Sequence, residues 1–502
     1  MADGGLYEKV LAQIEAGDRP PETRPPRSSA AVVIWRRRQG DLEVFWIKRA
    51  RTLQFMAGFH AFPGGGLSRR DRGGEEAALP QGTEAAPPMA AMPVAVTDGV
   101  GDLGPILCDG LVNCVLRELH EETGLLLSPR DDAQRLVYAG RWLTPPLGPL
   151  RFDNRFFLLE WSEDEPQQPR VTSSEAEHGE WIRPQEALAL WHRGEIVTAP
   201  PILKILQVLL EEGPEKGLAR LREPLEANLG PHRRVEFRPG VLLFPLRTPT
   251  LPPAAYTNCY VLGTGEAVLV DPGSPYEPEI DRLHQALQAL ESREGRKITA
   301  IWLTHHHPDH IGGVEKLRHR LGVPVCAHDH TAERLQEIDI PVDNRLSDGQ
   351  KVVLAGATDF PIRIVHTPGH ARGHLCFLEE THGSMLVGDL VAGFGTIVID
   401  PPEGNMGDYL SSLQRVRQSE PRALFPSHGP MTVNAAVKID EYLQHRLWRE
   451  ERILNAWLSG AREPAKLRAR VYDDVPPIAH PLAERQIVAH LEHLDAAGRL
   501  EG

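Results

Sequence analysis

The sequence predicts a multidomain protein of mixed α/β and α+β class, and three observations support this. The chain has 502 residues, which corresponds to about three domains at the usual domain size. Hydrophobic residues make up 41% and charged residues 25% of it, an ordinary globular composition that excludes wholesale disorder. Short apolar runs separated by turns alternate with helical patterns, and the last part is nearly all helical.

Charge and cysteine content exclude several classes of protein. Lys and Arg number 55 against 69 Asp and Glu, giving a net charge of −14, so a long-range positive field that attracts nucleic acid is not expected. The 5 cysteines are scattered and form no Cys-x-x-Cys pair, which fits a reducing compartment rather than a disulfide scaffold. No apolar run approaches the length of a membrane span. We therefore expect a cytoplasmic protein with no membrane partner.

The first domain is expected over residues 29–210, after an N-terminal helix and linker at 1–28. Apolar runs at 30–35 and 42–50 flank a polar turn, which is a β-hairpin pattern. A helix over about 106–122 follows.

The rest of the chain divides into further segments by its composition. Residues from about 68 to 105 are rich in Gly, Ala, Pro and Glu without a period, which predicts a disordered insertion. A charged stretch broken by Pro and Gly at 211–234 predicts a linker. A second domain is expected at 235–435 and a helical, winged-helix-like domain at 436–502.

Three carboxylates recur on the helix predicted near residue 115. Glu118, Glu121 and Glu122 are spaced i, i+3 and i+4, so their Cβ atoms would lie about 5–6 Å apart on one face. Like charges this close repel, and a hard cation that prefers oxygen ligands, such as Mg²⁺ or Mn²⁺, would stabilise them. Taken alone, carboxylates at this spacing more commonly form a solvated acidic face of a helix. Gly124 can end the helix at positive φ.

The surroundings of this helix resemble the Nudix hydrolases, which split nucleoside diphosphates linked to another moiety. The string at 117–125 is similar to the second half of the Nudix box and the turn at 63–66 to its opening. Segments 55–66 and 145–157 resemble the long-insert subfamily that includes coenzyme A diphosphatases. The resemblance implies an α/β/α sandwich, with Asp109 where the box has an upstream Glu. It also implies that Glu118, Glu121 and Glu122 bind Mg²⁺ or Mn²⁺, that Glu121 and Glu122 are catalytic, and that Arg117, Gly64, Gly65 and Gly124 support the motif.

A second set of potential metal ligands is rich in histidine. The string Thr-His-His-His-Pro-Asp-His at 304–310 follows an apolar run. Further ligand-type residues come in turns directly after apolar runs, where side chains can converge at the edge of a sheet. Imidazole together with carboxylate is typical of zinc sites. We expect His306 to point away, and His374 either to support the ligands or to be a core histidine. The candidate ligands are His305, His307, Asp309, His310, His370, Asp389 and His428.

These strings resemble the metallo-β-lactamase superfamily, an αββα sandwich with a metal site at one end. The HxHxDH string and the later GH, GD and HG pairs occur in the family's order, and Asp271 matches an aspartate that orients ligands from below. The resemblance implies two zinc ions about 3.5–4 Å apart that polarise the scissile group and supply the nucleophile. It implies that His305, His307 and His370 hold one zinc, that Asp309, His310 and His428 hold the second, and that Asp389 bridges them, with Asp309 and Asp389 catalytic.

The order of this domain and the helical C-terminus resembles the lactamase-like protein 2 family, which includes a mitochondrial single-strand endoribonuclease. The segments that carry the resemblance include 388–396, 408–413, 426–430 and 445–453. A basic set in the last domain could contact phosphates, although a solvated charged face is the favoured explanation. That set is Arg462, Lys466, Arg468 and Arg470.

The sequence therefore predicts a bifunctional hydrolase. The expected activities are phosphodiester or RNA cleavage at the zinc site and diphosphate cleavage of a nucleotide derivative at the Nudix site. One alternative is an acyl-CoA thioester hydrolase fused to a coenzyme A diphosphatase. Another is a zinc hydrolase with a non-catalytic Nudix binding domain. The expected partners are a small-molecule nucleotide or coenzyme A derivative and, in the first case, single-stranded RNA. The oligomeric state is left open.

Overall fold

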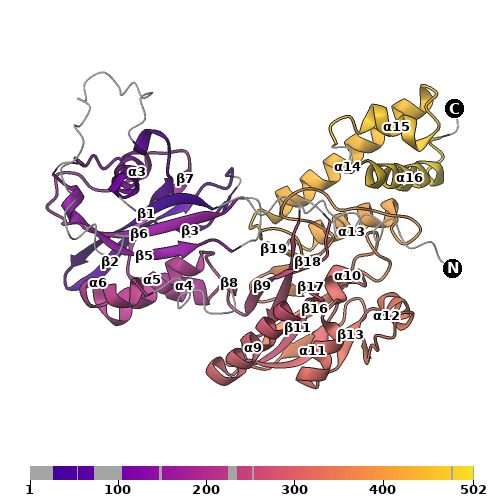
Figure 1. The fold of residues 1–502 in the computed structure, drawn as a ribbon, viewed down its shortest axis with the longest axis horizontal. Helices are drawn as coiled ribbons and strands as arrows, with labels where there is room; N and C mark the ends of the chain where they lie inside the picture. The colour runs from indigo at the N-terminus through magenta and orange to yellow at the C-terminus, as the bar shows by residue number, and fades with distance from the viewer. Residues whose placement is uncertain are drawn as a thin grey trace. The chain divides into compact units, whose positions relative to one another are not determined.

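The computed structural model describes residues 26–53, 55–72, 105–129, 131–145, 150–223, 234–251, 254–475 and 479–500. The chain divides between Pro239 and Gly240 into two compact units, each described here by itself (Figure 1). The predicted N-terminal helix and most of the predicted insertion lie outside the described residues.

The first unit is built on a mixed sheet with the strand order β3-β2-β1-β6-β5. β1 (Arg27–Arg38) and β2 (Asp41–Arg49) form the predicted hairpin, with Trp35 opposite Val44. β6 runs parallel to β1, whereas β4 pairs with β1 and β7 with β2. The other strands are β3 (His60–Ala61), β4 (Gly64–Gly66), β5 (Leu136–Leu143), β6 (Phe152–Glu160) and β7 (Ala176–Ile182).

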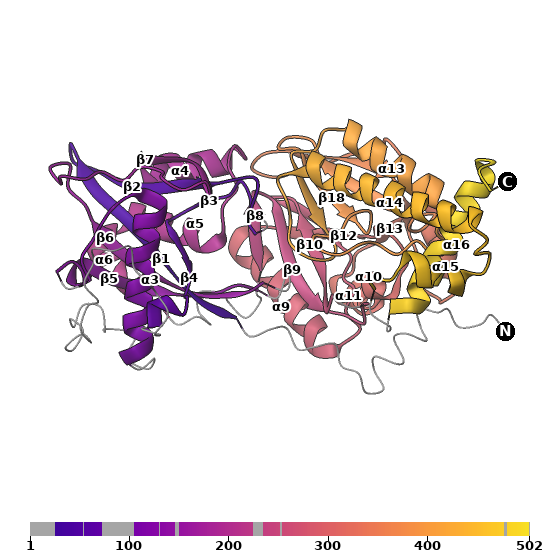
Figure 2. The same cartoon turned by 90° about the horizontal axis from the view of Figure 1, so that it is seen from above.

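Helices cover both faces of this sheet (Figure 2). Val32 and Ile34 of β1 belong to the core that contains Leu119 of α3 (Pro105–Thr123). Val33 belongs to the core formed with α4 (Pro184–His192) and α5 (Pro200–Glu211). Successive strand residues point to opposite faces, so a strand covered on both sides reads as one continuous apolar run.

Two predicted boundaries in this unit need correction. The insertion cannot begin at residue 68, because the amide and hydroxyl of Ser68 bond to Asp71 in a short 3₁₀ helix, η1 (Arg70–Arg72). The predicted linker is also partly folded, because Pro214 and Leu221 are buried. The elements concerned, and the remaining ones in this unit, are α6 (Gly213–Lys216), α7 (Leu218–Leu221), η3 (Ala133–Arg135) and β8 (Val235–Arg238).

The second unit contains two sheets. The first has the order β14-β13-β12-β11-β10-β9 and the second β15-β16-β17-β18-β19. The rings of Trp302 and Phe377, one from each sheet, lie 5.2 Å apart. The strands are β9 (Val241–Arg247), β10 (Tyr256–Leu262), β11 (Glu266–Val270), β12 (Lys297–Trp302), β13 (Val325–Ala327), β14 (Asn344–Arg345), β15 (Lys351–Leu354), β16 (Phe360–His366), β17 (Leu375–Glu379), β18 (Ser384–Gly388) and β19 (Ala423–Pro426).

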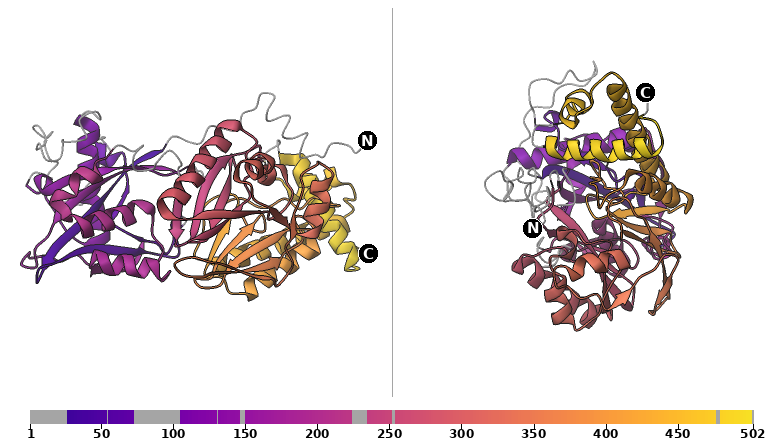
Figure 3. Two further views of the ribbon diagram at one scale, coloured as in Figure 1. Left: turned by 90° about the horizontal axis from the view of Figure 1, so that it is seen from below. Right: turned by 90° about the vertical axis from the view of Figure 1, so that its right-hand side faces the viewer.

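Helices cover the outer face of each sheet in this unit (Figure 3). α9 (Glu277–Glu294) and α11 (Val314–Leu321) share a core with the first sheet. α13 (Met406–Gln418) and α14 (Ala435–Leu458) share a core with the second. α10 (Pro308–Ile311) and α12 (Asp329–Gln336) lie in the connections that follow β12 and β13. The layers are therefore helix, sheet, sheet, helix.

The C-terminal helices form the last core. α15 (Pro464–Val471) and α16 (His480–Ala496) pack with the end of α14. Ile487 and Leu494 of α16 are fully buried in this core. Among the described residues, no helix combines the length and the apolar character needed to cross a membrane.

Candidate metal centre

Strand ends bring the histidine-rich string to one edge of the second unit. β11 and β12 are parallel, and so are β18 and β19. The carboxyl ends of β11 and β12 therefore lie side by side, as do those of β18 and β19. Asp271 follows β11, the string 304–310 follows β12, Asp389 follows β18 and His428 follows β19.

The carboxylate of Asp271 orients two residues at this edge of the sheet. Its Oδ1 accepts a hydrogen bond from the Thr304 amide at 2.8 Å, and its Oδ2 accepts one from the Thr304 hydroxyl at 2.6 Å. The same Oδ2 lies 2.9 Å from Nδ1 of His310. Asp271 has a φ of 50°, a left-handed conformation that costs energy in a residue other than glycine. This strain is consistent with a side chain whose direction matters.

Three imidazoles form the first candidate ligand set. One ligand atom from each of His305, His307 and His370 lies within 4.8 Å of the others. Burial lowers the pKa of all three rings, and the neighbouring imidazoles add to the effect on His305 and His307. Neutral imidazole is the form that binds metal. Nδ1 of His370 donates to the carbonyl of Val398 at 2.7 Å, which leaves Nε2 free to face the cluster.

A second set combines two imidazoles with a carboxylate. The ligand atoms of Asp309, His310 and His428 also lie within 4.8 Å of one another. Burial lowers the pKa of His428, but the carboxylates of Asp389 and Asp309 outweigh it and raise that pKa to about 10. The pKa of the Asp309 carboxyl is lowered, because His310 and His428 outweigh its desolvation. Two carboxylates therefore hold negative charge among buried imidazoles.

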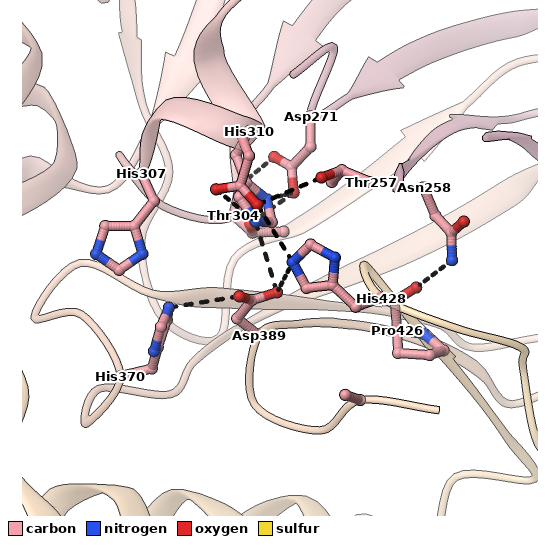
Figure 4. Close-up of polar contacts among 12 residues, drawn as sticks. Thr257, Asn258, Asp271, Thr304, His307, His310, His370, Asp389, Pro426 and His428 are labelled. Atoms are coloured by element: carbon pink, nitrogen blue, oxygen red, sulfur yellow. Dashed lines mark hydrogen bonds and ion pairs between the residues drawn. The ribbon is translucent and has the colours of Figure 1, made fainter. Parts of the chain in front are cut away.

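Asp389 lies between the two sets (Figure 4). Its Oδ1 is 3.5 Å from Nε2 of His310 and 3.4 Å from Nε2 of His428, and its Oδ2 is 3.5 Å from Nε2 of His370. One carboxylate oxygen thus faces each ligand set. This is the arrangement that a carboxylate shared by two cations would need.

The donor atoms fit divalent cations of the zinc type. Nε2 of His310, Nε2 of His370 and Oδ1 of Asp389 are buried without a hydrogen-bond partner. Buried polar atoms normally have a hydrogen-bond partner. Three such atoms that face one another without a partner therefore fit a bound cation. Imidazole with carboxylate is the donor set that zinc prefers.

Several supporting residues surround the ligands. Nε2 of His374 accepts the amide of Asp389 at 3.0 Å, so His374 holds that backbone rather than joining either set. A side chain at Gly388 would place its Cβ 2.5 Å from His374. Asn258 was not predicted from the sequence. Its side-chain amide donates to the carbonyls of Pro426 and Gly429 at 2.9 and 2.8 Å and so fixes the turn that carries His428. Bonds to backbone carbonyls leave no motif in the sequence. His306 belongs to neither ligand set.

The carboxylates of the first unit are arranged differently. Glu122 is buried and accepts the Gly64 amide at 2.9 Å, and burial raises its pKa to about 7. Nη1 of Arg117 bonds Glu118 at 2.8 Å and Glu121 at 2.9 Å. The three carboxylates therefore do not form a set of ligand atoms within 4.8 Å of one another. They are held by Arg117 and by the turn at Gly64.

Two glycines near these carboxylates lie where a side chain would not fit or would be strained. A Cβ on Gly65 would lie 2.1 Å from Glu118, so a side chain there would displace that carboxylate. Gly124 ends α3 with a φ of 71°, as predicted.

Arg117 also pairs with Asp71, which precedes the insertion. Nε of Arg117 is 2.9 Å from Oδ1 of Asp71, and Nη2 is 3.0 Å from Oδ2. Sequence analysis assigned the upstream acidic position to Asp109, whose side chain lies outside the described part of the chain. The signal that could have found Asp71 is its position, six residues after Gly65 and just before the insertion.

Comparison with known proteins identifies the second unit. A family model described as the metallo-beta-lactamase superfamily matches residues 252–428, which span Asp271 and all seven candidate ligands. A second, the beta-lactamase associated winged helix domain, matches residues 464–501. A beta-lactamase-like protein 2 homolog from Drosophila melanogaster is 31% identical over 261 residues, covering 49% of this chain and 84% of the relative. The chain belongs to the metallo-beta-lactamase superfamily. It is accordingly a hydrolase of that superfamily, with an αββα sandwich and a small C-terminal winged helix domain, and its fold implies a divalent metal, typically zinc.

Two further proteins are similar to parts of this chain. An atrochrysone carboxyl ACP thioesterase from Aspergillus chevalieri is 33% identical to this chain over 202 residues, covering 40% of this chain and 60% of the relative. The crystal structure of a NUDIX hydrolase from Alicyclobacillus acidocaldarius aligns over 100% of its length with 40% of this chain, at 23% identity and a TM-score of 0.30. A TM-score this low supports no conclusion about the first unit.

Proposed function

We propose that this chain is a bifunctional metal-dependent hydrolase. Its second unit would hold two zinc ions, one on His305, His307 and His370 and the other on Asp309, His310 and His428. The observation that carries this proposal is the position of Asp389, one oxygen of which faces each set. Its first unit would be a Nudix diphosphatase over residues 29–210, with Glu118, Glu121 and Glu122 on Mg²⁺ or Mn²⁺.

Different residues of the second unit would have different roles in hydrolysis. Two divalent cations, when bound, would polarise the scissile bond and make water acidic enough to attack at neutral pH. Asp271 and Thr304 orient the imidazoles through the hydrogen bonds described above. Asp309 and Asp389 are the carboxylates of the cluster that can take up the proton released in the attack. His374 holds the backbone of Asp389 in place.

A thioester is the substrate class that we favour for this site. The thioesterase relative supports it, because that protein is 33% identical to this chain over 202 residues. The basic set of the last domain does not offer a free phosphate-binding face. Lys466 pairs with Glu463 and Arg468 with Glu484, each at 2.9 Å, and Arg462 lies over the Trp457 ring. With a net charge of −14, this weighs against binding a long polyanion.

Phosphodiester cleavage of single-stranded RNA is the second candidate. The match to a winged helix domain at residues 464–501 supports it, as does the similarity to a beta-lactamase-like protein 2 homolog. A short RNA would need fewer cationic contacts than a long one, so the charge argument is weaker for short substrates.

For the first unit we propose that the substrate is coenzyme A or another nucleotide derivative, hydrolysed at its diphosphate bond. The contacts that support this are those between Arg117 and the carboxylates of α3, and between Gly64 and Glu122. An acyl-CoA would then present a bond for each half, the thioester for the second unit and the diphosphate for the first.

One panel of substrates tests these assignments. Zinc-loaded full-length protein would be assayed on acyl-CoA thioesters, nucleoside diphosphate derivatives with Mg²⁺ or Mn²⁺ added, and short single-stranded RNA. We expect thioester and diphosphate cleavage. Cleavage of RNA without thioester cleavage would replace the first candidate by the second. No hydrolysis of any of the three would refute the proposed function.

A further inference from the structure

A loop that begins at Asp389 also touches His370. The loop, residues 389–405, connects β18 to α13. The carbonyl of Val398 in this loop accepts the hydrogen bond from Nδ1 of His370 at 2.7 Å. The direction of the His370 ring therefore depends on where this carbonyl is held.

The C-terminal helices hold the neighbouring carbonyl. The carbonyl of Ile397 accepts hydrogen bonds from the guanidinium of Arg446 on α14 and, at 3.0 Å, from the side-chain amide of Gln486 on α16. Arg446 also donates to the Gln486 side-chain oxygen at 3.2 Å. Arg446 and Gln486 are 2% and 6% exposed, so water cannot readily replace these bonds.

Two more side chains of these helices hold the loop on either side of Ile397. The hydroxyl of Tyr442, one turn before Arg446 on α14, accepts the amide of Ala392 at 3.0 Å and lies 2.9 Å from the carbonyl of Gly395. Arg485 on α16 bonds the Asp400 carboxylate and the carbonyl of Pro401. The loop is thus held at both ends and at its middle by the C-terminal helices.

We propose that Gln486, Arg446 and Arg485 are positioning residues for His370, so that the winged helix domain completes the metal site. The inference rests on the proposed function, in which His370 is a ligand. The hydrogen bond to Val398 keeps the proton on Nδ1 and presents Nε2 to the cluster. Partners that orient a metal-binding histidine in this way typically contribute about 10–100-fold in metal affinity. The winged helix domain then acts on the site by fixing a backbone segment, without touching substrate or metal.

Zinc titration of the full chain tests this. The protein would be stripped with a chelator, and Zn²⁺ alone would be returned in competition with a chromophoric chelator, for wild type and Gln486→Leu. We expect one of the two ions to bind about 10–100-fold more weakly in the variant and the other to bind as before. The same substitution in a His370→Ala background should have no further effect, because the ligand through which Gln486 acts is already gone.

His490→Leu is the matched control. His490 lies one turn after Gln486 on α16, is fully buried and bonds Glu450 rather than the loop. We expect it to leave both zinc affinities unchanged. If Gln486→Leu does not fold, Arg485→Gln, at a partly exposed position, should weaken binding of the same ion.

Three results would overturn the inference. One is a Gln486→Leu protein that binds both ions as wild type does. Another is a His490→Leu protein with the same loss as Gln486→Leu, which would indicate a general effect of stability. The third is a further loss in the His370→Ala background. A wild-type chain that takes up no zinc would refute the proposed function and the inference together, and is distinguishable from these three.

Discussion

Nδ1 of His310 lies 2.9 Å from Oδ2 of Asp271, and both side chains are buried. The carboxylate also accepts the amide and hydroxyl of Thr304. A carboxylate that accepts from Nδ1 keeps the proton there and leaves Nε2 as the atom that can bind a metal. Asp271 therefore selects the tautomer of His310 and fixes the end of β12 at the same time.

Replacing Asp271 by Asn should weaken zinc binding. An amide can still accept from the Thr304 amide, but its NH₂ group would face Nδ1 of His310 and favour the tautomer with the proton on Nε2. We expect affinity for one ion to fall about 10–100-fold, measured by zinc titration of chelator-stripped protein. Asp281→Asn, which breaks an exposed pair with Arg320, is the control. Equal zinc affinities in the two variants would contradict this role.

Replacing Asp389 by Asn should abolish turnover while the fold survives. The variant keeps the shape of the side chain and loses the charge that faces both ligand sets. Turnover of the substrate found in the panel should fall by at least about 10²-fold, comparable to the loss of a preorganised charge at other active sites. Circular dichroism should be unchanged. Undiminished turnover would rule out a shared carboxylate and with it the two-metal arrangement.

Asp71 should support Arg117. Asp71→Asn breaks the two-pronged pair with Arg117, in which the Asp71 side chain is 3% and the Arg117 side chain 24% exposed. Because Arg117 is partly solvated, we expect a loss of about 1–3 kcal/mol in unfolding free energy rather than the larger cost of a fully buried pair. Urea unfolding of Asp71→Asn and of Asp109→Asn, as the comparison variant, measures this loss. An equal or larger loss in Asp109→Asn would contradict this role of Asp71.

The metal-site cluster was predictable because its residues follow strands. A ligand-type residue directly after a buried apolar run lies at a sheet edge, and parallel neighbours bring such residues together. The string 304–310, Asp271 and Asp389 all carry this signal. The hairpin of β1 and β2 and the helical character of the last part of the chain were likewise visible in the sequence pattern. That each ligand set binds its own ion stays a prediction.

Contacts through the backbone were not predictable. The bond from His370 to Val398, and those from Arg446 and Gln486 to Ile397, end on carbonyl oxygens that every residue possesses. Asp71 was missed for another reason, since 45 residues, most of them insertion, separate it from Arg117 in sequence. The stretch that forms the two short helices after α5 contains Gly213, Pro214 and Gly217, which suggested a linker. The burial of Pro214 and Leu221 shows that it is packed instead.

The C-terminal helices should lose stability as pH falls below about 6.5. Glu450 accepts from Nδ1 of His490 at 3.3 Å and of His493 at 2.8 Å, and also bonds Arg499. Burial lowers the pKa of His490 below its ordinary 6.5, and the charge of Arg446 adds to this. Burial raises the pKa of Glu450, but hydrogen bonds from His490 and His493 outweigh it and lower that pKa below 4.5.

The sign follows from which state binds the proton first. With both pKa values depressed in the folded state, the unfolded chain is protonated first as pH falls, so stability decreases. The histidine contributes from pH 6.5 downward and the glutamate from pH 4.5 downward. Calorimetry of the full chain should show a Tm that declines below pH 6.5 in wild type and declines less steeply in His490→Leu. Parallel pH profiles for the two proteins would contradict this explanation.

The two proposed active sites should be separable by mutation. Their proposed ligand sets lie in different compact units, with Glu118, Glu121 and Glu122 before Pro239 and all the histidine-rich residues after it. The proposed metals also differ in kind, since carboxylates would bind Mg²⁺ or Mn²⁺ and imidazoles would bind zinc. No ligand is shared, so a change at one site removes no donor from the other.

A pair of variants tests this separation. Glu121→Gln combined with Glu122→Gln should abolish diphosphate cleavage, because it removes two of the three negative charges that recruit the hard cation, and should leave the zinc-site activity within about twofold of wild type. Asp389→Asn should do the reverse. Both activities are to be assayed in both proteins at the same metal concentrations, so that each variant serves as the control for the other. If each variant loses both activities in parallel, the sites depend on one another, and a single composite active site would explain the chain better than two independent ones.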